Sequence, residues 1–218
     1  IDPVRFIGNR SSGKQGHAIA AALRKAGAEV TLVSGPVNIP DPAGVKTIHI
    51  ETAAEMLAAC EAALPATDIA ICAAAVSDWG PENAASQKIK KSPGAAAPTL
   101  SLKENPDILK TISNHKSRPA LVVGFAAETE NLIANATKKL NTKGCDWILA
   151  NNVAENAFGG DKNHVFWLSH AGQEDWGTQS KAALAEALVA KIIQRASEKE
   201  SLSHAPNEQP KLANDFPG

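Results

Sequence analysis

Apolar residues are spaced along the chain in two different patterns. Short, nearly continuous apolar runs are typical of strands that are buried on both faces of a parallel sheet. They occupy residues 29–33, 68–75, 120–126, 147–150 and 164–168. Elsewhere apolar residues recur every three or four positions, which is the period of an amphipathic helix. These helical segments are residues 19–25, 53–64, 106–115, 132–143 and 181–196.

The strand and helix segments alternate, which predicts an α/β fold. We expect a Rossmann-like three-layer sandwich, in which helices cover both faces of a mostly parallel sheet through right-handed crossovers. Ligands of such sheets bind at the carboxyl ends of the strands. Polar residues follow four of the predicted strands, namely Ser34, Asp78, Glu128 and Asn151. A functional site is therefore expected at this edge of the sheet.

Two segments interrupt the alternation. Residues 80–98 are rich in Ala, Ser, Pro and Lys and have no clear period, which predicts a mobile excursion over the site. Residues 197–218 contain few large apolar groups and are typical of a disordered tail. The predicted organisation is one domain over residues 1–196, followed by this tail.

Composition narrows the class of protein. The 218 residues have a formal net charge of −1, so no overall basic field attracts nucleic acid or an anionic membrane. No apolar run approaches the roughly 20 residues that span a bilayer, and the pattern of a secretion signal is absent, so we expect a cytoplasmic protein. Cys60, Cys72 and Cys145 are far apart and are interpreted as buried thiols, not as a disulfide framework or a zinc site.

A glycine-rich loop, residues 8–16, runs directly into the first helical segment. The first N–H groups of a helix have no intrahelical partner and the helix dipole is positive there, so Ser11, Ser12 and Gly13 mark a candidate phosphate site. The P-loop pattern fails because Gln15 stands where Ser or Thr would bind Mg²⁺, and the dinucleotide fingerprint is absent. A purely structural loop capped by Ser12 is the alternative.

Two groups of lysines are further candidates. Lys88, Lys90 and Lys91 lie in the excursion and could close over a polyphosphate, although a short basic run is more often a solvated surface. Lys139 and Lys143 are four residues apart and share one helix face, and this spacing alone favours a plain surface position.

Two aspartates each have two possible roles. Asp78 could bind a ribose hydroxyl or a metal ion, or could simply begin a turn. Asp107 or Asn105 could cap the helix that starts near Pro106. No pair of nucleophile and base is evident, so catalysis by this chain would depend on positioning and charge stabilisation.

Taken together, seven blocks of sequence resemble bacterial phosphopantothenate-cysteine ligases. The first block is residues 2–7, and the second is Asn9, residues 11–14 and Gly16. The other five are residues 74–78, 88–91, 105–108, 124–129 and 150–151, and all seven stand in the family's order. The resemblance covers residues 1–196 and implies a CTP-dependent ligase domain. In bacteria this domain is usually the C-terminal half of a bifunctional coenzyme A biosynthesis protein, with a decarboxylase upstream, and family members form homodimers.

The resemblance implies a reaction in two steps. The carboxylate of 4′-phosphopantothenate attacks the α-phosphate of CTP, which releases pyrophosphate and leaves an acyl-cytidylate. The amine of L-cysteine then displaces CMP and forms the amide. Mg²⁺ would be held largely by the phosphates, so no metal ligand is assigned to the protein.

By the same resemblance, Lys88 supports formation of the acyl-cytidylate and Asn9 supports the second step. The implied nucleotide-binding residues are Ser11, Ser12, Gly13, Cys72, Ala73, Ala74, Asp78, Lys88, Asn105, Pro106, Asp107, Ile108, Phe125, Lys139 and Lys143. Lys139 and Lys143 would contact the triphosphate, contrary to the surface position that their spacing favours.

The chain departs from the family in several places. Family members have a further strand, central in the sheet, and a Gly-Pro-Thr or Gly-Gly-Thr turn ahead of the position of Asp2; both are missing here, which suggests a fragment. Gly8, Arg10 and Gln15 replace the more usual Ser, His and Met, and Asn152 stands where Asp is common. Two alternatives therefore stay open: a nucleotide-binding module without catalysis, and a divergent P-loop-like nucleotidase.

Overall fold

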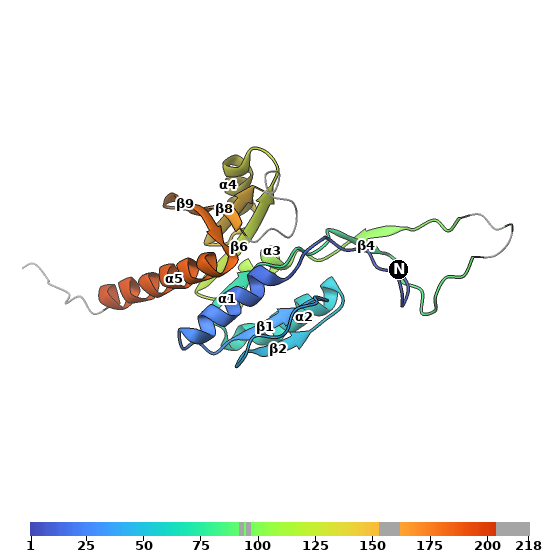
Figure 1. Ribbon diagram of the computed structural model, residues 1–218, viewed down its shortest axis with the longest axis horizontal. Helices are drawn as coiled ribbons and strands as arrows, with labels where there is room; N and C mark the ends of the chain where they lie inside the picture. The colour runs from blue at the N-terminus through green and yellow to red at the C-terminus, as the bar shows by residue number, and fades with distance from the viewer. Residues whose placement is uncertain (92–93, 95–96, 153–161, 204–218) are drawn as a thin grey trace, which may run out of the picture.

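The computed structural model describes residues 1–91, 94, 97–152 and 162–203, and its largest sheet has five strands in the order β3-β6-β7-β8-β9 (Figure 1). These strands are β3 (Ile69–Cys72), β6 (Leu121–Glu128), β7 (Trp147–Asn152), β8 (Lys162–Ser169) and β9 (Gly172–Ser180). The first three are parallel, which confirms the mostly parallel sheet, whereas β8 and β9 are antiparallel to their neighbours.

The prediction of a parallel strand at residues 164–168 was therefore wrong in its direction. β7 ends at Asn152 and β8 begins at Lys162. This separation is shorter than the dozen or more residues that a parallel crossover needs. The chain consequently returns alongside β7 in the opposite direction.

The other four strands form two smaller sheets. β1 (Thr31–Ser34) and β2 (Lys46–His49) are parallel, and β4 (Trp79–Pro81) and β5 (Leu102–Glu104) are antiparallel. Within the described residues β1 pairs only with β2, and β3 pairs only with β6, so each has one unpaired edge. All four residues of β3 are only partly buried.

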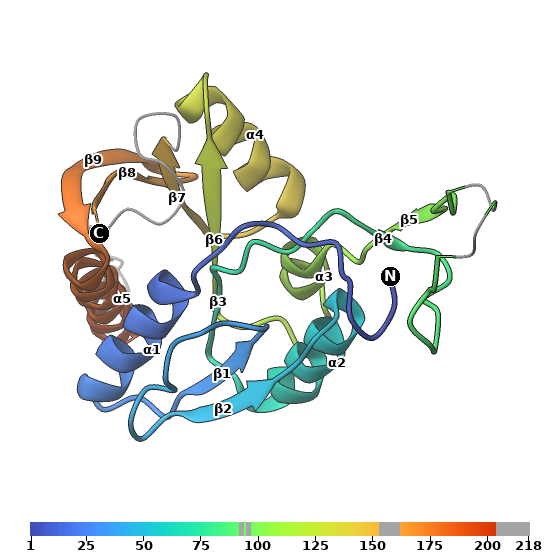
Figure 2. The same cartoon turned by 45° about the vertical axis from the view of Figure 1, so that its right-hand side comes forward.

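Helices cover both faces of the five-stranded sheet (Figure 2). The helices are α1 (Lys14–Lys25), α2 (Ala53–Ala63), α3 (Ile108–Ser113), α4 (Leu132–Lys143) and α5 (Lys181–Ser203), with the short 3₁₀ helix η1 (Leu64–Ala66) after α2. Val122 and Ala126 of β6 pack towards α2, α3 and α4, while Leu121 and Val123 pack towards α1 and α5. This alternation confirms the three-layer sandwich. None of the helices in the described residues is long and apolar enough to cross a membrane.

The packing of α3 on β6 depends on Gly124. A Cβ atom at this position would lie 2.6 Å from Leu109 Cδ2 and 2.8 Å from Ile148 Cδ1, which is closer than real Cβ contacts. The glycine thus lets the start of α3 approach β6 beside Cys72, the last residue of β3, where the site is expected.

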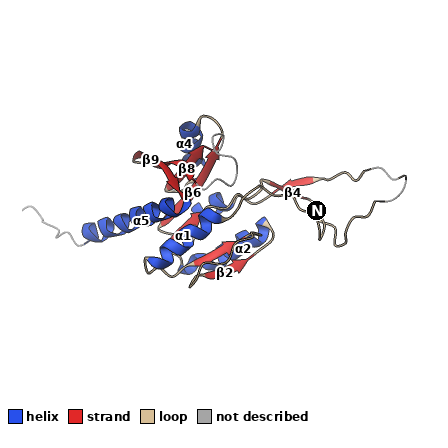
Figure 3. Cartoon of the chain, viewed as in Figure 1, coloured by secondary structure: helices blue, strands red, loops and turns tan. Residues whose placement is uncertain are grey.

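The predicted excursion is an arm, residues 79–104, that extends away from the body of the protein (Figures 1 and 3). Sequence reasoning missed the antiparallel pair β4 and β5 at its base. Residues 92–93 and 95–96 of the excursion lie outside the described residues.

The predicted tail begins too early. α5 continues to Ser203, so the prediction was wrong for residues 197–203, and residues 204–218 lie outside the described part of the chain. Gln194 Nε2 donates to Glu198 Oε1 at 2.9 Å, and Ser201 Oγ donates to Ser197 O at 3.0 Å. These contacts four residues apart support a helix whose composition is polar.

The cysteines form no disulfide. Cys145 is buried, as predicted, whereas Cys60 and Cys72 are only partly buried. Burial raises the pKa of the Cys72 thiol to about 12, so this thiol at the end of β3 is protonated at neutral pH and is a poor nucleophile.

Candidate functional site

The glycine-rich loop ends at Gly13, directly before α1. Gly13 is the N-cap residue with φ of 71°, and no side chain caps the helix. A Cβ atom at this position would lie 2.7 Å from Val37 Cγ1. The alternative of a loop capped by Ser12 is therefore wrong. A helix start without a side-chain cap suits an anion, because the first N–H groups of a helix need an acceptor.

Hydrogen bonds bring three distant blocks of the sequence together next to this loop. Asn9 Nδ2 donates to Val76 O at 3.0 Å, in the segment that follows β3. Asn105 Nδ2 donates to Ser77 O at 2.9 Å, and the Asn105 backbone N–H donates to Asp78 O at 2.8 Å. Asn9 and Asp78 thus lie on neighbouring segments at the carboxyl end of β3, with the start of α3 on the other side.

A second set of contacts connects α3, α4 and β6. Asp107, one of the two predicted candidates, caps α3, and its carboxylate accepts a hydrogen bond from Lys110 N at 3.0 Å. The same carboxylate forms an ion pair with Lys143 of α4. One helical turn earlier, Lys139 Nζ donates to Phe125 O of β6 at 2.7 Å. The surface position that spacing favoured for Lys139 and Lys143 is therefore wrong, since Lys139 contacts β6 and Lys143 contacts Asp107 at the start of α3.

Burial and neighbouring charge shift two pKa values at this edge. Burial lowers the pKa of Lys139, and the positive charge of Lys143 lowers it further. Partial burial by itself would raise the pKa of Asp107, but the Lys143 ammonium and the Lys110 N–H stabilise the carboxylate, so the net pKa is lowered. Among Asp107, Lys139 and Lys143, two ammonium groups thus face one carboxylate, which is paired with Lys143. The excess positive charge suits a polyanionic ligand.

The Asp107→Ala variant is expected to be less stable at neutral pH by about 1 kcal/mol, because the helix loses its N-cap. Asp107→Asn is the control, since Asn caps a helix almost as well and only the ion pair with Lys143 is lost. Because the pKa of Asp107 is lowered in the folded state, the stabilisation is present above its unfolded-state pKa and is lost as the pH falls through its folded-state value. Urea unfolding of the three proteins at pH 7 and pH 3 measures this, and an Ala variant as stable as wild type at pH 7 would contradict it.

Lys88 does not lie with these residues in the single chain. It is an exposed residue of the arm, which extends away from the body (Figure 1). Its neighbour Ile89 is held at the N-terminal segment: Ile89 N donates to Asp2 Oδ2 at 3.1 Å, and Arg5 Nη2 donates to Ile89 O at 2.8 Å. The expectation that the excursion covers the start of α1 is therefore wrong within one chain.

The implied nucleotide-binding residues other than Lys88 lie on the connected segments. They are Ser11, Ser12 and Gly13 before α1; Cys72, Ala73, Ala74 and Asp78 at and after the end of β3; Asn105, Pro106, Asp107 and Ile108 at the start of α3; Phe125 in β6; and Lys139 and Lys143 in α4. A cavity of about 130 Å³ adjoins them and is lined by Ala73 and Phe125, together with Gln15 and Asn163. Sequence reasoning assigned no ligand to Gln15 or Asn163. The only signal was that Gln15 belongs to the glycine-rich loop.

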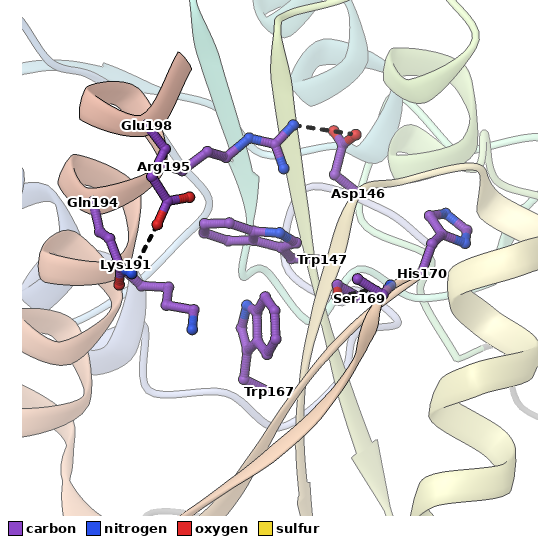
Figure 4. Close-up of a pocket in the computed structure, with 10 residues that line it drawn as sticks. Asp146, Trp147, Trp167, Ser169, His170, Lys191, Gln194, Arg195 and Glu198 are labelled. Carbon is purple, nitrogen blue, oxygen red and sulfur yellow. Dashed lines mark hydrogen bonds and ion pairs between the residues drawn. The ribbon is translucent and has the colours of Figure 1, made fainter. Parts of the chain in front are cut away.

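A larger cavity of about 360 Å³ lies at the amino end of β7 (Figure 4). Trp147 and Trp167 meet edge to face, with ring centroids 5.4 Å apart, and Lys191 Nζ lies 4.4 Å above the ring of Trp167. Lys191 also contacts Glu174 Oε1 at 2.5 Å, and Arg195 lies 3.9 Å from Asp146. The cavity contains none of the predicted site residues and its cations are paired, so we assign it a packing role.

The fold and the polar strand ends define an α/β domain with a ligand site at the carboxyl edge of its parallel strands. The chain belongs to the family of the DNA/pantothenate metabolism flavoprotein C-terminal domain, whose model matches residues 1–196.

Relatives and solved structures agree with this family. The coenzyme A biosynthesis bifunctional protein CoaBC of Escherichia coli K12 is 42% identical over 204 residues, which cover 91% of this chain and 50% of that protein. The chain thus spans about half the length of the curated relatives that it matches. The crystal structure of the C-terminal domain of a CoaBC protein is 35% identical, with a TM-score of 0.75 over 91% of this chain and 90% of that one. A Cab2 mutant in complex with phosphopantothenate-cysteine shares the fold, with a TM-score of 0.68, 17% identity and coverage of 92% and 82%.

Proposed function

We propose that this chain joins 4′-phosphopantothenate to L-cysteine at the expense of CTP, in coenzyme A biosynthesis. The observation that carries the proposal is the convergence of Asn9, Asp78 and Asn105 with Lys139 and Lys143 at the end of β3 and the neighbouring part of β6. Membership of the family and the names of the relatives support it. The upstream decarboxylase of a bifunctional protein and a cytoplasmic location are parts of the same proposal.

In the first step, the carboxylate of phosphopantothenate attacks the α-phosphate of CTP and pyrophosphate leaves. Negative charge builds up on the phosphate oxygens, so ammonium groups are suitable partners. Lys139 and Lys143 stand at this edge, and Lys88 is the third candidate. Mg²⁺ is commonly held by substrate phosphates with few protein ligands, and we propose that the phosphates of the nucleotide hold it here.

In the second step, the amine of cysteine attacks the acyl carbonyl carbon and CMP leaves with the former carboxylate oxygen. The carbonyl oxygen carries negative charge in the transition state and needs hydrogen-bond donors. The amide of Asn9 has two N–H donors, of which one is bonded to Val76 O. We assign the other one to the acyl oxygen.

We infer that the chain forms a homodimer through the arm and the N-terminal segment. Six of the seven exposed large apolar residues in the described chain lie on these two segments: Val4, Phe6, Ile7, Trp79, Leu100 and Leu102. Phe6 is 82% exposed, which is costly unless another surface covers it. A second copy would also bring its own Lys88 to a site that Lys88 of the same chain does not reach.

The double variant Phe6→Glu with Leu102→Glu is expected to be a monomer, because two charges would be placed in the apolar interface. Ile193→Glu is the matched control, since Ile193 is 51% exposed on α5, outside the two segments. Light scattering after gel filtration measures the mass of each protein. Wild type and the control should both have twice the mass of the double variant, and a monomeric wild type would contradict the inference.

The dependence of product release on each substrate tests the function. The proposal predicts pyrophosphate release from CTP only when phosphopantothenate is present, and CMP release only when cysteine is added. Release of phosphate from a nucleotide without any carboxylic acid would instead support the P-loop-like nucleotidase. Binding of CTP in a calorimeter without turnover would support the non-catalytic module.

A further inference from the structure

Residues 2–5 form a tight turn that uses only one of the two carboxylate oxygens of Asp2. Asp2 Oδ1 accepts hydrogen bonds from Val4 N at 2.9 Å and from Arg5 N at 3.0 Å, and Arg5 N also donates to Asp2 O at 3.2 Å. Aspartate is favoured at the first position of such a turn, and proline, here Pro3, at the second. The local sequence therefore builds the turn, and it leaves Asp2 Oδ2 for other partners.

The second oxygen of Asp2 holds Ile89 of the arm together with Arg5. Asp2 Oδ2 accepts from Ile89 N at 3.1 Å and from Arg5 Nε at 3.0 Å, and it forms an ion pair with Arg5 Nη2. Arg5 Nη2 in turn donates to Ile89 O at 2.8 Å. Both backbone polar groups of Ile89 are thus bound by one ion pair, in which the aspartate side chain is fully buried. Charge-assisted hydrogen bonds of this kind are strong, so the backbone is held firmly at this point of the arm.

Ile89 is also the point of the arm that determines where Lys88 stands. The N-terminal segment runs alongside the arm (Figure 1), and a second contact, from Ala85 N to Ile1 O at 2.9 Å, lies four residues before Ile89. Ile89 is partly buried, whereas Lys88 and Lys90 on either side of it are exposed. Because a lysine side chain is long and flexible, the reach of its ammonium group depends on where its backbone is fixed. For Lys88 that fixed point is the next residue.

We propose that Asp2 and Arg5 are positioning residues for Lys88, and that their ion pair holds the backbone of Lys88 where its ammonium group meets the α-phosphate of CTP. The inference rests on the proposed function, in which Lys88 stabilises charge in the first step. Such stabilisation requires that the charged group is in place before the reaction, and a misplacement of about 1 Å can cost about 100-fold in rate. Asp2 and Arg5 act through Ile89 and need no contact with a substrate.

The test compares Asp2→Ala with wild type in pyrophosphate release at saturating substrates and in calorimetric binding of CTP. Loss of the ion pair predicts about 10- to 100-fold slower release and unchanged affinity for CTP. Asp2→Asn keeps an oxygen acceptor for Ile89 N and loses only the charge, so its rate should lie between the two. Glu174→Ala is the matched control on β9, because Glu174 also accepts from an N–H, Trp176 Nε1 at 3.0 Å, and pairs with a cation, Lys191. It should release pyrophosphate as fast as wild type.

A double-mutant cycle with Lys88→Gln determines whether Asp2 acts through Lys88. If it does, adding Asp2→Ala to Lys88→Gln leaves the rate of the single Lys88→Gln variant unchanged, because no ammonium group remains to be positioned. A general structural role of Asp2 would slow release by the same factor with Lys88 and without it, which would overturn the inference. The cycle with Asp2→Asn gives the same answer if Asp2→Ala does not fold.

The other outcomes are equally distinct. Asp2→Ala should have the same mass as wild type in light scattering, and slow release accompanied by a change of mass would assign Asp2 to assembly and overturn the inference. If wild type is active and Asp2→Ala releases pyrophosphate equally fast, Asp2 does not position Lys88 and the proposed function stands. If wild type releases no pyrophosphate from CTP and phosphopantothenate, the proposed function itself fails, and this inference fails with it.

Discussion

The Lys88→Gln variant is expected to release pyrophosphate from CTP at least about 100-fold more slowly than wild type, and CMP release should fall with it. Glutamine retains a similar length but removes the ammonium group, so charge on the α-phosphate and the leaving pyrophosphate is stabilised less. CMP release falls as well, because the second step consumes the acyl-cytidylate, which now forms more slowly. Lys91→Gln is the matched control, since Lys91 belongs to the same basic run and resembles no catalytic position. Normal pyrophosphate release by Lys88→Gln would remove Lys88 from the mechanism.

Mixed dimers of two inactive variants test whether the arm brings Lys88 to the site of the partner subunit. If Lys88 acts on the partner's site, a mixed dimer of Lys88→Gln and Asn9→Asp has one site with both native residues. Random mixing after mild dissociation should then restore roughly a quarter of wild-type activity, because half of the dimers are mixed and each has one intact site of two. No recovery would show that Lys88 and Asn9 act within one chain, which requires the arm to fold back.

The Asn9→Asp variant is expected to form the acyl-cytidylate and then stall. The acyl oxygen becomes anionic in the second step. A carboxylate cannot donate a hydrogen bond to this oxygen and repels its negative charge, so CMP release should slow by about 100-fold or more. Pyrophosphate release should instead appear as one rapid turnover per site. Quenched samples analysed by mass spectrometry should contain the acyl-cytidylate. Asn114→Asp is the control, because Asn114 likewise bonds a backbone carbonyl, Lys110 O at 2.7 Å, but at the end of α3.

Equal slowing of pyrophosphate and CMP release in Asn9→Asp, without accumulation of the intermediate, would contradict this division of roles. It would place Asn9 in substrate binding or in the first step. The contact of Asn9 with Val76 would then be the reason, since its loss would displace the loop from the end of β3.

Sequence reasoning succeeded where the local pattern was strong. The bounds of α4 were predicted correctly, and β1, β3, β6 and β7 were found within a few residues. β9 was missed because its sequence is polar, and it is a strand only through its ladder with β8. α1 begins at Lys14, earlier than the period indicates, since the start is determined by the backbone of Gly13. Tertiary pairing thus decided β9, whereas a local backbone conformation decided the start of α1.

The candidate site was predicted unevenly for a similar reason. The polar strand ends and the cap at Asp107 are local features, and both were located from the sequence. The spacing of Lys139 and Lys143 says nothing about what they face, because that depends on how α4 packs on β6. The direction of the arm, and the meeting of Gln15 with Asn163 in one cavity, come from contacts between distant segments.

The central claim is that the acid is activated as an acyl-cytidylate, and isotope transfer tests it most directly. Phosphopantothenate labelled with ¹⁸O in its carboxylate is incubated with CTP and cysteine, and the CMP is analysed by mass spectrometry. The account predicts one ¹⁸O atom in the phosphate of CMP, because the carboxylate oxygen that attacks phosphorus remains there when the amine displaces CMP. Unlabelled CMP formed together with the amide would contradict it.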